Sequence, residues 1–348
     1  GVGAKLTITA RPGSTDSTVL TSGSSLTFPN TRVGMVATTP LSIRNTGNSA
    51  TSLNTLAVSG AAFRLHGRLA LPVRLEPDDA VDVVVEFVPD ATTALAGSLQ
   101  VEAVTIALRG IGDTPVPLSG IDLHSLPSTM QPLDQPAVGI RLDEPYPLAV
   151  TGRLTLSFTS DSFVDDPMIQ FSSGGRSADF QIPANSRDAI FGLNATTVAL
   201  QAGTVAGRIS LTASFQVGSV SLTPSPAPVR TSTVPALEPQ LRTVTVGARS
   251  DSSFELLISG FTTTRALREL SLRFTPVPGS NLQTTTLVAP VEPAFQTWFQ
   301  GTSSRAFGSQ FVASITVMVQ GDSSAVQAVS VTATNSRGES APVSVNLR

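Results

Sequence analysis

The sequence of 348 residues contains no cysteine. Without thiols the chain can form neither disulfides nor thiolate zinc sites, so any stable domain must be held together by an ordinary hydrophobic core. The absence leaves the compartment open, although small secreted domains of eukaryotes usually rely on disulfides. Stability without cross-links therefore requires well-formed secondary structure throughout.

Lysine and long apolar runs are almost as scarce. Of the 22 basic residues only Lys5 is a lysine, the net charge is −3, and no basic stripe is present that would attract nucleic acid. No apolar run reaches the roughly 18 residues of a membrane helix. The first five residues, Gly1 to Lys5, lack the apolar core of a signal peptide, so we expect a mature exported chain or a cytoplasmic one.

The residues that are abundant favour β-structure. The chain is 41% hydrophobic and 14% charged, with 27 glycines and 25 prolines, which is too apolar for disorder and too interrupted for long helices. Polar and apolar residues alternate from Lys5 to Ala10 and again from Val81 to Phe87, as in half-buried strands. Such segments recur every 8 to 12 residues, which is the spacing of a β-sandwich.

Two proline-rich stretches divide the chain. Residues 113–117 (Asp-Thr-Pro-Val-Pro) read as a linker, and residues 223–228 (Thr-Pro-Ser-Pro-Ala-Pro) read as a second semi-rigid spacer. The length suits two or three domains. The sequence therefore predicts an all-β chain of three immunoglobulin-like β-sandwich domains in tandem, at 1–113, 114–234 and 235–348.

A series of short motifs between Leu26 and Gly112 carries a more specific resemblance. In order, the motifs are Val33-Gly34, Asn45-Thr46-Gly47, Phe63, Leu75-Glu76-Pro77, Phe87-Val88-Pro89 and Leu108-Arg109-Gly110. This order resembles the Hydin-like, or ASH, immunoglobulin-type domain, which in bacteria also occurs in "choice-of-anchor D" surface proteins. The resemblance implies a sandwich of seven to nine strands, related to the major sperm protein fold and without a catalytic site.

The rest of the chain resembles known modules only in general pattern. The segment Val329 to Asn335 is similar to the closing hairpin of immunoglobulin-like modules in bacterial surface proteins, with Asn335-Ser336-Arg337-Gly338 as its turn. The second and third domains resemble β-sandwich units that follow Hydin-like domains in large secreted bacterial proteins. Together these resemblances imply an extracellular or cell-surface location.

The inventory for catalysis is thin. His66 and His124 are the only histidines, and they fall in different predicted domains, so a Ser-His-Asp triad or a two-histidine metal site would have to span a linker. Both are interpreted as surface residues, with an interdomain contact left open for His124. No phosphate-binding glycine pattern is present. We therefore predict no enzyme, no cofactor, and no catalytic, cofactor-binding or metal residues.

Two loops could still carry chemistry. Asp161, Asp165 and Asp166 follow a predicted strand and could offer oxygen ligands to calcium. Their spacing is not that of an EF-hand and no bidentate Glu follows, so we favour a solvated turn. Asn194-Ala195-Thr196 fits the sequon for N-glycosylation, which would usually be inert in a bacterial protein.

The one aromatic cluster surrounds Trp298, the only tryptophan, with Phe295, Phe299, Phe307 and Phe311 nearby. Exposed aromatic rings in such a cluster would suit a carbohydrate, because a flat ring stacks on the C–H groups of a sugar. The alternative is that Trp298 fills the core of the third sandwich, as a tryptophan does in many such folds. We favour the core interpretation.

The favoured function is that of a non-enzymatic extracellular structural protein, a stalk or fibre subunit built from tandem sandwiches. The strand from Lys5 to Ala10 could complete the sheet edge of a neighbouring copy and so build a filament. Partners would then be further copies or other cell-surface proteins. The alternatives are an adhesin or carbohydrate-binding module, an accessory region of a larger secreted enzyme, and a cytoplasmic or ciliary scaffold.

Overall fold

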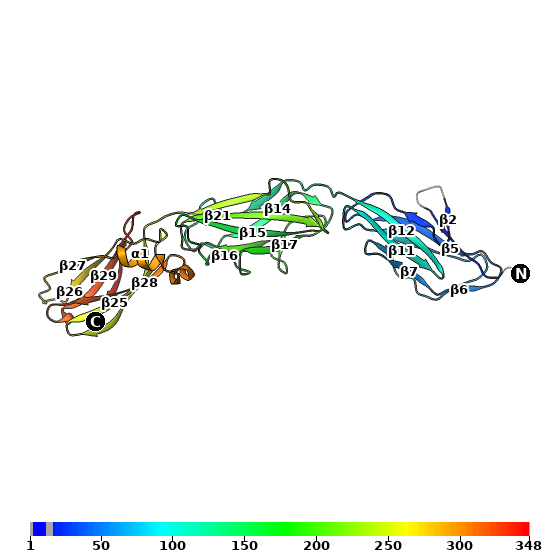
Figure 1. Cartoon of the computed structure of the whole chain (residues 1–348). Coiled ribbons are helices and arrows are strands. Elements are labelled where there is room, and N and C mark those ends of the chain that lie inside the picture. The colour runs from blue at the N-terminus through cyan, green and yellow to red at the C-terminus, as the bar shows by residue number, and fades with distance from the viewer. Residues whose placement is uncertain (1–2, 12–16, 348) are drawn as a thin grey trace.

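The structure, a computed structural model in which residues 3–11 and 17–347 are described, is an elongated and gently bowed row of three β-sandwiches (Figure 1). Strands hold 53% of the residues and helices 5%, which confirms the predicted fold class. Three clusters of buried apolar side chains, one in each sandwich, form the cores. We call the sandwiches unit 1, unit 2 and unit 3 in chain order.

Unit 1 pairs two sheets. The first runs, in spatial order, β2 (Thr18–Leu20), β1 (Leu6–Ala10), β5 (Ala37–Asn45), β10 (Ala80–Phe87) and β8 (Phe63–Leu65). The second runs β3 (Ser25–Thr27), β12 (Val104–Asp113), β11 (Ala94–Val101) and β7 (Leu56–Ser59), with β4 (Thr31–Arg32) also beside β12. A small ribbon of β6 (Thr51–Leu53) and β9 (Val73–Leu75) completes the unit.

Three of its phenylalanines form the centre of this core. The rings of Phe28, Phe63 and Phe87 lie 5.0 to 5.7 Å apart between centroids. Gly110 on β12 faces them, and a Cβ there would lie 2.4 Å from the Phe87 ring. The motif residues Phe63, Phe87 and Gly110 are therefore explained by packing between the two sheets.

The N-terminal strand has partners on both of its edges. Within β1, Ile8 lies opposite Leu20 of β2 on one side and opposite Ile43 of β5 on the other. Ile8 and Ala10 are buried in the core of unit 1. The expectation that residues 5–10 are available to a neighbouring sheet is thus not met, because donation would first require β1 to leave its own sheet and open the core.

Unit 2 also has two sheets. One runs β13 (Ile121–His124), β14 (Ala137–Tyr146), β20 (Thr197–Gln201) and β16 (Gln170–Phe171), with β18 (Ser186–Asp188) also on β14. The other runs β19 (Ile190–Phe191), β17 (Ser177–Ile182), β15 (Val150–Ser160), β21 (Gly207–Val217) and β22 (Val220–Ser221), with β23 (Val229–Val234) also on β21.

The position of β23 corrects one prediction. Residues 223–228 do not separate two domains, because the chain returns after them and six residues of β23 pair with β21. Thr223 Oγ1 also accepts a hydrogen bond from the backbone N–H of Phe215, at 2.8 Å. The prolines thus interrupt a strand along one edge of β21, where β22 pairs with the last residues of β21 and β23 with its first six.

Unit 3 has a three-stranded sheet, β24 (Gln240–Ser250), β25 (Ser253–Phe261) and β28 (Gln310–Met318). Its second sheet runs β27 (Thr286–Pro290), β26 (Glu269–Pro276), β29 (Val326–Thr334) and β30 (Val343–Asn346). Between β27 and β28 lie the helix α1 (Glu292–Gln300) and the 3₁₀ turn η1 (Ser303–Phe307), and η2 (Ser323–Ala325) follows β28. Across residues 3–11 and 17–347, no helix is long and apolar enough to cross a membrane.

Candidate functional site

The two histidines are far apart in the fold. His66 follows β8 on the surface of unit 1, where its Nδ1 and the Nε of Arg64 each lie 2.6 Å from the carboxylate of Glu86. These contacts, led by the hydrogen bond from Arg64, lower the pKa of Glu86 below its usual value. His124 is the last residue of β13 in unit 2, and its Nδ1 lies 2.9 Å from the hydroxyl of Ser125. The two rings lie in different units and cannot form one site.

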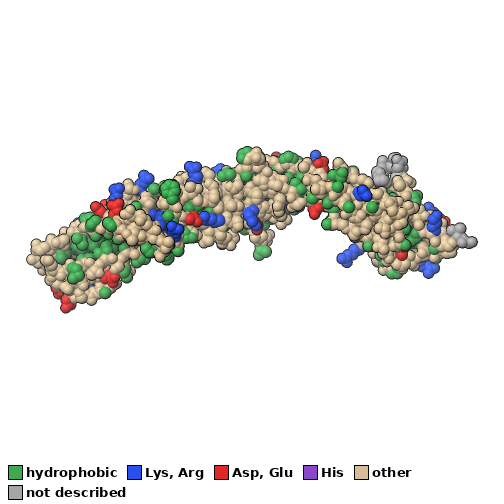
Figure 2. All heavy atoms as spheres, in the orientation of Figure 1, with side chains coloured by type: hydrophobic (Ala, Val, Ile, Leu, Met, Phe, Trp, Pro, Cys, Tyr) green, Lys and Arg blue, Asp and Glu red, His purple; other side chains and the backbone are tan. Residues whose placement is uncertain are grey.

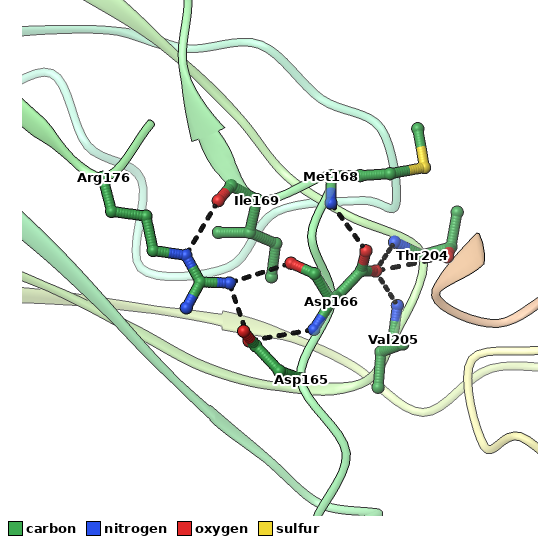
Figure 3. A network of polar contacts seen from close by, with 7 residues as sticks. All are labelled: Asp165, Asp166, Met168, Ile169, Arg176, Thr204 and Val205. Carbon is green, nitrogen blue, oxygen red and sulfur yellow. Dashed lines mark hydrogen bonds and ion pairs between the residues drawn. The ribbon is translucent and has the colours of Figure 1, made fainter. Parts of the chain in front are cut away.

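The acidic loop after β15 holds a network of polar contacts rather than a cluster of carboxylates (Figure 3). Asp165 pairs with Arg176 at 2.7 Å and remains largely exposed. Asp166 is 0% exposed and turns the other way, into the molecule. In the described part of the chain no group of three or more histidine or acidic residues could hold a metal ion. The calcium interpretation of Asp161, Asp165 and Asp166 therefore has no geometric support.

The carboxylate of Asp166 accepts four hydrogen bonds. Its Oδ1 accepts the backbone N–H of Met168 at 3.0 Å, and its Oδ2 accepts the N–H groups of Thr204 and Val205 at 2.6 and 3.0 Å. The hydroxyl of Thr204 donates to the same Oδ2 at 3.2 Å. Hydrogen bonds to an ionised acceptor are the strong ones, so this carboxylate fixes the loop between β20 and β21.

The fixed loop is also the place where unit 2 meets unit 3. Ser309 of unit 3 donates its N–H to Thr204 Oγ1 at 3.0 Å and its hydroxyl to the Thr204 carbonyl at 2.7 Å. Ala206 N–H donates to the Thr263 carbonyl at 2.9 Å, in parallel with those bonds. Thr204 and Ser309 are both buried, which makes these bonds costly to break. We call this set of contacts the second joint.

On the side of unit 3, Arg265 holds the second joint. Its guanidinium donates to the carbonyls of Gly308 and Phe299 and to the hydroxyl of Ser304, and it lies 4.9 Å from the centroid of the Phe299 ring. Burial lowers the pKa of Arg265, while the charge of Asp166 acts to raise it. Gly308, with φ of +61°, passes so close to Asp166 that a Cβ would lie 2.7 Å from Oδ1.

The contact between units 1 and 2, which we call the first joint, is made by the motif Val33-Gly34. Val33 is 0% exposed, and its side chain belongs to the core cluster of unit 2. Gly34, with φ of +79°, lies against Leu148 and Val217, since a Cβ would sit 3.0 Å from Leu148. Ser219 adds two hydrogen bonds to the Asp90 carbonyl, at 3.1 Å from its N–H and 2.8 Å from its hydroxyl.

Trp298 is neither a fully buried core residue nor a fully exposed one. It is half-buried on α1 and packs against the core of unit 3, while Phe295 and Phe299 of the same helix are buried. The exposed side of Trp298 lines an open pocket of about 260 Å³. The residues that line this pocket with it include Arg242, Ser259, Phe307, Gln310 and Val312. The core interpretation is thus only partly correct, and we call this hollow the Trp298 pocket.

Further hollows and the sequon lie elsewhere on the surface. A groove of about 840 Å³ lies on the outer face of unit 2 around the ion pair of Arg153 and Asp179. A second, of about 600 Å³, opens at the far end of unit 3 and reaches Phe254 and Phe274. Asn194 lies on an exposed turn after β19. Charged side chains are scattered over the visible face without forming a stripe (Figure 2).

Comparisons with known proteins give fold-level likeness only. No protein-family model matches the sequence, and no curated protein is similar enough to be a relative. Among solved structures, a two-domain fibronectin type III segment of chicken tenascin is 11% identical with a TM-score of 0.30, and covers 66% of this chain and 98% of its own. Domains A168–A170 of titin are 12% identical with a TM-score of 0.23, and cover 98% of this chain and 99% of their own.

A PapD-like (ASH) domain of human CEP192 is also similar, at 18% identity and a TM-score of 0.20 over 31% of this chain and 87% of its own. Solved structures of similar fold thus include tandem immunoglobulin-like and fibronectin-like domains and an ASH domain. At TM-scores of 0.30 and below, nothing about the activity or assembly of these proteins is carried over.

The sequence points to Val33-Gly34 and Asp166 but misses their role, and it misses Thr204, Arg265 and Ser309 entirely. A buried acid among Ser and Thr residues has no periodic signature. Apart from Met168, its partners Thr204 and Val205 lie 38 and 39 residues away in the chain, so only the fold brings them together.

Proposed function

We propose that this chain is a non-enzymatic structural rod that holds its ends at a fixed separation, as a stalk or spacer of an extracellular or cell-surface protein. The observation that carries the proposal is the second joint, in which the carboxylate of Asp166 fixes Thr204 and Thr204 bonds twice to Ser309. Contacts between domains of one chain are usually polar and loose, so a buried network here resists bending.

The first joint supports the same function. A side chain of unit 1 that is part of the core of unit 2 cannot swing freely, because each hinge movement would expose Val33. The rod would then be stiff at both joints, in agreement with the single row of units in Figure 1.

The finer assignment rests on the sequence. The order of motifs from Val33-Gly34 to Leu108-Arg109-Gly110 supports a Hydin-like (ASH, choice-of-anchor D) unit 1 in a bacterial surface protein. Scarce lysine and strand surfaces rich in Ser and Thr support export. Outward positions of β15 and β21 in unit 2 illustrate this composition: Thr151, Thr155, Ser157, Thr159, Ser210, Thr212 and Ser214. Since β1 is held between β2 and β5, strand donation is not included in the proposal.

Small-angle X-ray scattering of the full chain tests rigidity. We expect a single, well-defined maximum dimension for the natural protein and a broader distribution for Thr204→Val. The valine keeps the shape of the side chain but removes the hydroxyl that bonds Asp166 and Ser309. Thr212→Val, on the outer face of β21, is the matched control and should leave the distribution unchanged.

A broad distribution already present in the natural protein would refute the rod. Hydrolysis of any substrate in a broad screen would refute the non-enzymatic assignment, provided that a control for contaminating hydrolases shows the activity to belong to this protein. A second function, ligand binding, is favoured by one specific observation, the Trp298 pocket.

A further inference from the structure

The Trp298 pocket has a fixed aromatic surface. The indole Nε1–H donates to the Gln310 carbonyl at 3.3 Å, which holds the ring in one orientation. The Phe307 ring lies 6.2 Å away between centroids and nearly parallel, at 27°. Phe307 is 51% exposed and Val312, on the outer face of β28, is 74% exposed. Large apolar side chains that are exposed beside a concave surface are typical of a binding site.

The pocket lining has one charged side chain, Arg242. Arg242 lies with its guanidinium 5.4 Å from the centroid of the Phe261 ring, which restrains the side chain. Over the ranges 3–11 and 17–347 no carboxylate forms an ion pair with Arg242. An anionic group would therefore find an unpaired partner here.

Polar groups complete the lining. The hydroxyl of Ser259 lies 2.5 Å from that of Thr243, and between them the two hydroxyls keep further donor and acceptor capacity. The volume of about 260 Å³ is close to the lower limit of ordinary ligand pockets and suits one small ring. The face of an aromatic ring carries partial negative charge and attracts slightly positive C–H groups.

We propose that the Trp298 pocket binds a carboxylated sugar ring, a uronate residue of an acidic polysaccharide. The C–H face of the sugar lies against Trp298 and Phe307, its carboxylate meets Arg242, and its hydroxyls reach Ser259. This activity goes beyond the rod and does not depend on it, because every residue named belongs to unit 3. A rod with such a site near its second joint would attach laterally to an acidic polysaccharide.

The experiment uses the full chain and the fluorescence of Trp298, the only tryptophan in the protein. Trimers of galacturonate, glucuronate and mannuronate are titrated, each beside its neutral methyl ester. We expect a saturable change of emission with at least one trimer and about tenfold weaker binding of its ester, the loss of one charge-assisted hydrogen bond. Calorimetry repeats the titration without the optical probe.

Matched variants locate the site. Arg242→Gln and Phe307→Ala should each weaken binding about tenfold or more. Arg208→Gln and Phe163→Ala remove an exposed arginine and a 98% exposed phenylalanine from unit 2 and should bind as the natural chain does. Absence of binding for all three trimers in both assays overturns the proposal. Equal binding of the acid and its ester overturns the role of Arg242. If Arg208→Gln weakens binding as much as Arg242→Gln does, the site is not the Trp298 pocket. X-ray scattering of the same samples reports on the rod separately.

Discussion

Replacing Asp166 by asparagine should loosen the loop that carries the second joint. The amide has the same shape but only one acceptor oxygen, whereas the carboxylate serves Met168 through Oδ1 and both Thr204 and Val205 through Oδ2. If the amide oxygen takes the Oδ2 position, the NH₂ group faces the Met168 N–H, and one half-buried donor loses its acceptor. That loss costs about 1–3 kcal/mol, and the remaining bonds lose the strength given by the charge.

We therefore expect Asp166→Asn to destabilise the loop by about 2–4 kcal/mol. Hydrogen exchange read by mass spectrometry measures this locally, which is necessary because a chain of three units does not unfold in one step. The amides of Thr204 and Val205 should exchange at least about tenfold faster, since a factor of ten corresponds to about 1.4 kcal/mol. The amides of β1 in unit 1 should not change.

Asp165→Asn is the matched control, because the side chain of Asp165 is 62% exposed and pairs with Arg176 at the surface. Exposed ion pairs contribute less than about 1 kcal/mol, so exchange at Thr204 and Val205 should stay close to that of the natural protein. If Asp165→Asn and Asp166→Asn accelerate exchange equally, or neither does, then the buried carboxylate does not fix the joint and the reasoning is wrong.

Two further predictions concern unit 1. Gly34→Asn should bend the chain at the first joint and change its radius of gyration, because asparagine tolerates the φ of +79° but its side chain must displace Leu148. Gly67→Asn, at a φ of +76° in open space, should leave the radius of gyration unchanged, and equal effects of the two variants would contradict a packed joint. Glu86→Gln should lower the thermal midpoint of unfolding at pH 7 but should have little effect well below pH 4.5. The lowered pKa of Glu86 contributes stability that is present above the usual pKa of 4.5 and is lost as the pH falls through the pKa of the folded state. Glu76→Gln, which removes an exposed ion pair, should change the midpoint little at either pH.

The strands that could be predicted are those with regular alternation. Val81 to Phe87 falls within β10, and residues 154–158 and 207–213 fall within β15 and β21, because one face of each strand is buried and the other is wet. The sequence does not predict β14, where Val138, Gly139 and Ile140 are all buried in succession and the alternation is lost. It also misses α1, although Phe295 and Phe299 lie one helical turn apart on it.

The sequence by itself determined the class of the protein: all-β, built from sandwiches, without thiol chemistry and with no pair of histidines in one predicted domain. Those properties follow from composition and from the short-range periodicity of apolar residues, because both are visible in the sequence without knowledge of distant contacts. The tertiary structure alone decided that residues 223–228 lie inside unit 2, that Val33-Gly34 packs between units, and that Asp166 turns inward to Thr204. It also decided that Trp298 lines a pocket. Each of these depends on side chains distant in the chain meeting in a dry interior, and no local pattern records which partner a buried polar group will find.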